Sequence, residues 1–134
     1  MTRFRYPRVD DIITLNILAL GLYPVKRRDR HEVLSEARIR DVLEQAKSTR
    51  GGVYDKAAVL LAGLVRAHAF ASGNRRTAFV AAKRFVLDHN AKFKISDDPS
   101  NARVLLGIRE GYYSHDEIRE WIEDGSIRKF ERRE

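Results

Sequence analysis

The 134-residue sequence contains no cysteine, so disulfide bonds, thiolate metal sites and cysteine nucleophiles are all excluded. It also lacks an uninterrupted apolar run long enough to span a membrane. Residues 1–7 are basic and aromatic, and they hold no hydrophobic segment of the kind that a signal peptide needs. With neither an export signal nor a membrane segment, we expect the protein to reside in the cytoplasm.

What the chain does contain fits one folded domain spanning residues 1–134. Hydrophobic residues make up 43% and charged residues 34% of the sequence, which is the balance of a globular protein rather than a disordered one. The length is close to the most common size of a single domain. The formal net charge of +7 attracts anions, so nucleotides, nucleic acid and acidic proteins are all candidate ligands.

Helical periodicity dominates the pattern of apolar residues, and it predicts an all-α protein, a compact bundle of about six helices. The third predicted helix is almost unbroken in Ala, Leu and Val and should be buried nearly all round. A pattern typical of a strand is confined to residues 92–95. The predicted helices span residues 9–20, 35–47, 54–67, 75–89, 101–110 and 115–123.

Residues with known capping preferences mark several helix ends. Ser114 can cap the start of the sixth helix, and Gly21 is a plausible stop for the first. Asn90 and Gly125 can take the left-handed conformation that ends a helix. Between the first and second helices, residues 22–33 have no sustained period and carry a basic cluster, so we predict an exposed flap there.

The segment most informative for function is residues 68–77, which joins the third and fourth predicted helices. The amides of residues 73–76 would be first-turn donors without partners inside the fourth helix, backed by the positive end of its dipole. Such a place binds phosphate. Gly73 lets the backbone approach an anion, and two arginines follow it. His68, a few residues upstream, is placed to take a proton from a hydroxyl beside that anion.

Each of these residues also has a structural interpretation. A single histidine at a helix C-terminus is more often a cap or a packed side chain than a catalyst. Arg75 and Arg76 are of a type usually found on a solvated surface, and Gly73 with Asn74 is a common turn. Phe70 is expected to anchor the loop in the core under either interpretation.

The loop resembles the signature of the Fic/Doc superfamily, most closely that of the Doc (death-on-curing) toxins. The signature has histidine, any residue, phenylalanine, any residue, an acid, a small residue, asparagine, a variable or basic residue and arginine. Doc toxins have lysine where this chain has Arg75, and an apolar residue where it has Phe79. The matching residues are His68, Phe70, Gly73, Asn74 and Arg76, with Thr77 and Ala78 continuing the Doc pattern. Agreement at five spaced positions is a more specific sign of the superfamily than a lone glycine-rich turn would be.

The resemblance implies a Fic/Doc (Fido) fold and a transfer from ATP to a hydroxyl side chain of a protein target. Doc toxins transfer the terminal phosphoryl group and Fic enzymes transfer AMP; we favour the first and leave the second open. His68 would be the general base and Arg76 would offset charge in the transition state. The implied phosphate-binding residues are Gly73, Asn74, Arg75, Arg76 and Thr77. The implied target-binding residues of the flap are Tyr23, Lys26, Arg27 and Arg28.

One position departs from the signature. Ser72 stands where the family has an aspartate or glutamate that ligates magnesium. A neutral hydroxyl is a much weaker ligand for Mg²⁺ than a carboxylate, although phosphates and waters supply most of the coordination shell. The implied cofactors are therefore ATP and a weakly held Mg²⁺. An alternative is a Fido-fold module that binds nucleotide or protein with weakened catalysis.

Partners follow from the resemblance and the charge. Fic/Doc members that inhibit themselves carry a blocking helix with a serine or threonine and, four residues later, a glutamate; this chain has no such pattern. Restraint would then come from a separate antitoxin, and an acidic segment would suit the basic surface. The resemblance also suggests a protein target in the translation apparatus. Nucleic-acid binding is a third alternative, disfavoured because the arginines are spread over several segments.

Overall fold

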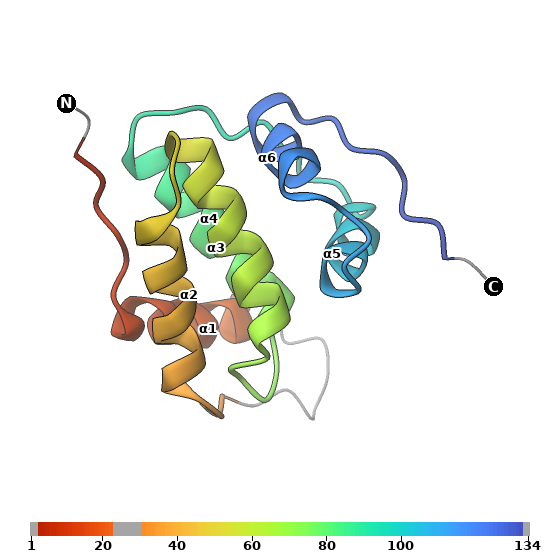
Figure 1. Cartoon of the computed structure of the whole chain (residues 1–134). Coiled ribbons are helices and arrows are strands. Elements are labelled where there is room, and N and C mark those ends of the chain that lie inside the picture. The colour runs from red at the N-terminus through yellow and green to blue at the C-terminus, as the bar shows by residue number, and fades with distance from the viewer. Residues whose placement is uncertain (1–2, 23–30, 133–134) are drawn as a thin grey trace.

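The computed structural model describes residues 3–22 and 31–132. These residues form six α-helices and no strand, so the predicted all-α bundle is confirmed (Figure 1). Within this part of the chain, no helix is long and apolar enough to cross a bilayer. The helices are α1 (Val9–Leu22), α2 (Glu36–Ser48), α3 (Val53–Ala67), α4 (Asn74–Asp88), α5 (Asn101–Arg109) and α6 (His115–Asp124).

Helix α3 lies at the centre of the fold. It packs against α2, α4, α5 and α6, while α1 runs crosswise and packs against α4 and α2 (Figure 1). Seven of the fifteen residues of α3 are buried and Arg66 is its one exposed residue, so the expected burial nearly all round is confirmed only in part. A Cβ atom on Gly63 would lie 2.6 Å from Cγ1 of Val42, so α2 and α3 are too close together there for any larger residue.

Local capping groups mark several helix ends, of which those at Ser114, Asn90 and Gly125 were expected. Ser35 precedes α2, and its Oγ accepts a hydrogen bond from the amide of Arg38 at 3.2 Å. Ser114 caps α6 and forms a capping box with Glu117. Asn90 (φ 57°) and Gly125 (φ 80°) both take the left-handed conformation beyond the helices they follow.

Two expectations about local structure are wrong. Gly21 lies inside α1, which continues to Leu22. Residues 92–95 form no strand, because the amide of Lys94 donates to the carbonyl of Ile122 at 2.9 Å at the end of α6 instead of pairing with an extended segment. Not every apolar residue of α1 faces the core, since Ile17 and Leu18 are 48% and 51% exposed.

A buried lysine joins α2 to α3. Lys56 is only 5% exposed, and its Nζ donates to the carbonyl of Thr49 at 2.7 Å and of Ala46 at 3.3 Å. These carbonyls end α2, where the negative pole of the helix dipole also favours a cation. The same ammonium lies 4.9 Å from the centre of the Phe4 ring. Lys56 therefore fixes the turn that delivers α3 into the core.

We expect Lys56→Met to lower the free energy of unfolding by about 2–3 kcal/mol. Methionine keeps the length of the side chain but leaves the carbonyls without their charged donor, and hydrogen bonds to charged groups are worth about 1.5–3 kcal/mol. Urea denaturation measures the change. The control is Lys47→Met, which removes an exposed lysine from the same turn. Equal losses in the two variants would contradict a structural role for the Lys56 ammonium.

Candidate active site

The loop between α3 and α4 is built on two left-handed residues. His68 (φ 48°) ends α3, and Gly73 (φ 77°) precedes α4. A Cβ atom at position 73 would lie 3.1 Å from Cδ2 of Leu20 and 3.2 Å from Nδ2 of Asn16, so conformation and space both favour glycine. His68, in contrast, keeps a conformation that is uncommon for residues other than glycine. Its side chain is exposed.

Asn74 clamps the loop from its first helical position. Its Oδ1 accepts from the amide of Phe70 at 3.0 Å, and its Nδ2 donates to the carbonyl of Phe70 at 2.8 Å. Phe70 is 2% exposed, so its expected role as an anchor in the core is confirmed. The same Nδ2 lies 3.4 Å from Nδ1 of His68, a long contact that orients the imidazole only loosely. Any contribution of Asn74 to phosphate binding would therefore come mainly from its backbone amide.

A buried asparagine supports the loop from behind. Asn16 in α1 is fully buried, and its Nδ2 donates to the carbonyl of Ser72 at 2.9 Å and to Oγ1 of Thr77 at 3.1 Å. Its Oδ1 lies 3.0 Å from Nδ1 of His31, which donates because an amide oxygen only accepts. The loop is thus held by α1 through side-chain bonds.

The structure does not support the expectation that Thr77 contacts phosphate. Thr77 is 1% exposed, and its amide donates to the carbonyl of Gly73 at 2.9 Å, which is the first hydrogen bond of α4. Its hydroxyl is engaged with Asn16. Thr77 therefore lies behind the loop as a supporting residue.

The end of the predicted flap is bonded directly to the loop. The amide of Ala71 donates to the carbonyl of Glu32 at 3.0 Å, and the amide of Leu34 donates to the carbonyl of Ala69 at 2.7 Å. A β-bridge joins Val33 to Phe70. The flap residues expected to bind a target lie outside the described residues: Tyr23, Lys26, Arg27 and Arg28.

In front of the loop lies a cleft of about 360 Å³. One wall is the loop with the start of α4, and the other is α5. Its lining residues are Val65, His68, Ala71, Ser72, Gly73, Asn74, Arg75, Arg76, Ala102, Leu105 and Arg109. Three of these are arginines and none is a carboxylate. The amides of residues 74–76 precede the first hydrogen bond of α4, so charge, donors and dipole all favour an anion here.

The sequence model of the Fic/DOC family matches residues 9–86, which is more than half of the chain. The chain belongs to the Fic/Doc family. The match runs from the start of α1 into the last turn of α4 and so includes the whole Fic/Doc loop together with Asn16, which supports it. A comparison with curated proteins gives no match.

The lining of this cleft suits an anion better than it suits a metal ion. Ser72 lines the cleft at the position of the acid in the family signature, and no other lining residue supplies a carboxylate. Among the described residues, no group of three or more His, Asp or Glu side chains is placed to hold a metal ion. Mg²⁺ in this cleft would depend on phosphate oxygens and water for its ligands.

Sequence reasoning missed three residues that shape this site. Asn16 and His31 support the loop, and Arg109 from α5 adds a third arginine to the cleft. Asn16 carried a signal, because it is a polar residue within the apolar face of a predicted helix. Arg109 carried none, since nothing local indicates that the end of α5 lies opposite the loop.

Proposed function

We propose that this Fic/Doc protein is a Doc-like toxin that transfers the terminal phosphoryl group of ATP to a hydroxyl side chain of a protein target. The observation that carries the proposal is the position of His68 at the edge of a cleft formed by the start of α4 and three arginines. A proton acceptor and an anion site lie side by side there. Membership of the Fic/Doc family supports nucleotide-dependent modification of proteins in general.

In the proposed reaction the backbone amides at the start of α4 hold the phosphates of ATP. The target hydroxyl attacks the terminal phosphorus as its proton passes to the unprotonated ring nitrogen of His68. A new oxygen to phosphorus bond forms, the bond to the leaving phosphate oxygen breaks, and ADP departs. Arg76 offsets the charge that spreads over the phosphoryl oxygens. Mg²⁺, when bound, would supply further neutralisation of the phosphates.

A second candidate is a Fic/Doc module that binds nucleotide or protein but transfers slowly. The observation that favours it is Ser72 in a cleft lined by no carboxylate, because a weakly held metal lowers turnover more than it lowers phosphate binding. AMP transfer, the reaction of Fic enzymes, is a third candidate, because the arginines would bind the α, β or γ phosphate of ATP.

Transfer of label from ATP tests the proposal. The protein is incubated with a cell extract, Mg²⁺ and ATP labelled at the α or the γ phosphate. We expect γ label on a protein band. Label from the α position would instead assign AMP transfer, and neither label, with nucleotide binding retained in calorimetry, would assign the binding module. Absence of both transfer and nucleotide binding would overturn all three candidate functions: phosphoryl transfer, AMP transfer and the binding module.

The biological role that we propose is that of a toxin held in check by an acidic antitoxin. The net charge of +7 supports an acidic partner. Expression of the chain alone should arrest bacterial growth, and the labelled target should belong to the translation apparatus. Sustained normal growth with the folded protein present would count against the toxin role.

A further inference from the structure

A second cavity, of about 620 Å³, lies on the other side of His68. It is a groove that runs along α3 between α2 and α6. The groove has room because the residues of α3 that line it include several small ones, among them Ala58, Ala62 and Ala67. Its walls include Gln45 from α2 and His115 from α6. We call it the α3 groove.

His68 is the one described residue that lines both the arginine-rich cleft and the α3 groove. The two cavities therefore meet at His68. A base that takes a proton from a hydroxyl must contact the hydroxyl on one side while the phosphate lies close by. Because the cleft is suited to the phosphates, the α3 groove offers a second approach to His68, apart from the side of the loop that the flap joins.

The charge of the groove next to His68 is positive. Arg38 donates from Nη1 to the carbonyl of Ala67 at 3.2 Å, and Arg66 donates from Nε to the carbonyl of Ile108 at 2.9 Å. A guanidinium has five N–H donors, so both retain donors for a ligand. Asp41 is the one acidic residue in the lining. Acidic side chains of a bound segment would meet two fixed guanidinium groups.

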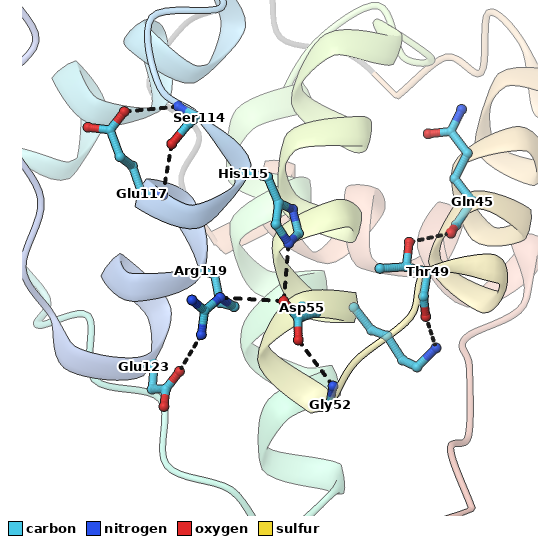
Figure 2. Close-up of polar contacts among 10 residues, drawn as sticks. Gln45, Thr49, Gly52, Asp55, Ser114, His115, Glu117, Arg119 and Glu123 are labelled. Carbon is cyan, nitrogen blue, oxygen red and sulfur yellow. Dashed lines mark hydrogen bonds and ion pairs between the residues drawn. The ribbon is translucent and has the colours of Figure 1, made fainter.

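The opposite wall is held by a carboxylate that does not line the groove. Asp55 near the start of α3 lies 3.2 Å from Nε2 of His115 and 3.4 Å from Nε of Arg119 (Figure 2). Its other oxygen accepts from the amide of Gly52 at 3.1 Å. These contacts tie α6 to α3, so this wall has a fixed position, and the guanidinium of Arg119 is already paired with Asp55. The uncompensated charge is concentrated at Arg38 and Arg66, beside His68.

We propose that the α3 groove binds the acceptor segment of the protein target, as an extended peptide with acidic residues next to the serine or threonine that is modified. This inference rests on the proposed function and names the substrate class of that site. From Ala58 to His68 the helix rises about 15 Å, which accommodates four or five extended residues. The acceptor hydroxyl lies at the His68 end of the groove, where acidic neighbours on the peptide reach Arg38 and Arg66.

Peptide pools with a central serine or threonine test the assignment. One pool has glutamate at the flanking positions and the other has lysine, and both receive γ-labelled ATP and the full chain. We expect the glutamate pool to be labelled at least ten times faster. Arg38→Glu should lower its labelling about tenfold, whereas Arg40→Glu, the same charge change at an exposed position of α2 outside the groove lining, should change it less than twofold.

Ala62→Leu is the second variant, since it fills the groove without changing charge. It should raise the KM for the glutamate pool while the affinity for ATP stays unchanged, and thermal unfolding monitors the fold of each variant. The same pool is titrated into ¹⁵N-labelled protein, where the shifted amides should lie along α3 and the facing side of α2. No shifts there, or equal effects of Arg38→Glu and Arg40→Glu, would overturn the α3 groove as a peptide site. Groove shifts without γ label on any substrate would overturn the transfer function instead.

Discussion

Replacement of His68 by alanine is expected to lower the rate of transfer by about 10²–10⁴-fold, the usual contribution of a general base, and so to abolish growth arrest. The histidine is exposed and lies where the cleft and the α3 groove meet. Alanine removes the imidazole without filling either cavity. The readout is the turnover number with γ-labelled ATP, followed by growth of cells that express each form.

The control for this variant is its affinity for ATP. Because the phosphates are assigned to the amides of α4 and the arginines, calorimetry should give the same dissociation constant for His68→Ala and the native protein. The left-handed backbone at position 68 is more costly for alanine than for asparagine, so His68→Asn serves as a second variant with less backbone strain. Retained toxicity in both folded variants would remove His68 from the mechanism.

Helix type and order were predictable because their signals are local. Ser35 and Ser114 cap the helices they precede, and Asn90 ends its segment in the left-handed conformation. Each of these effects depends on a residue and its neighbours within about one turn. The strand expected at residues 92–95 was wrong because the hydrogen bonding of this segment depends on a distant residue. Its backbone partner is the distant carbonyl of Ile122, which no local pattern identifies.

For the site, too, the features with local signals were predicted and those that depend on distant residues were not. His68, Gly73 and Phe70 were identified from spacing, and the structure brings them together in one turn between α3 and α4. The supports of that turn come from far away: Asn16 is 56 residues from Ser72 and 61 from Thr77. Periodicity indicates that position 16 is buried but does not identify its partner.

The buried polar groups were the hardest to predict. Lys56 drew no prediction from the sequence, yet it completes the end of α2. Asn74 was recognised from the signature as a phosphate-binding residue, and its side chain instead closes the turn on the main chain of Phe70. In both cases the residue satisfies backbone groups that the loop itself leaves unpaired. Such groups become visible only once the path of the chain is known.

The substitution Ser72→Asp is expected to raise transfer from ATP more than tenfold at low Mg²⁺. Ser72 lines the cleft, where no carboxylate is present, and aspartate would add a ligand that Mg²⁺ strongly prefers to a hydroxyl. A tenfold gain requires only about 1.4 kcal/mol of stabilisation, which is modest for one direct carboxylate ligand. The gain should shrink as Mg²⁺ is raised, since excess metal compensates for weak binding.

Ser72→Asn is the matched control, because asparagine has nearly the shape of aspartate without its charge. It should leave the Mg²⁺ dependence close to that of the native protein. A fall in activity or ATP affinity for Ser72→Asp would show that the arginines already neutralise the phosphates and that a new negative charge opposes them. An unchanged rate at every Mg²⁺ concentration would place position 72 away from the metal. Both contrary results can be told apart from the expected one in a single titration, because only a metal ligand at position 72 makes the effect of the aspartate depend on Mg²⁺.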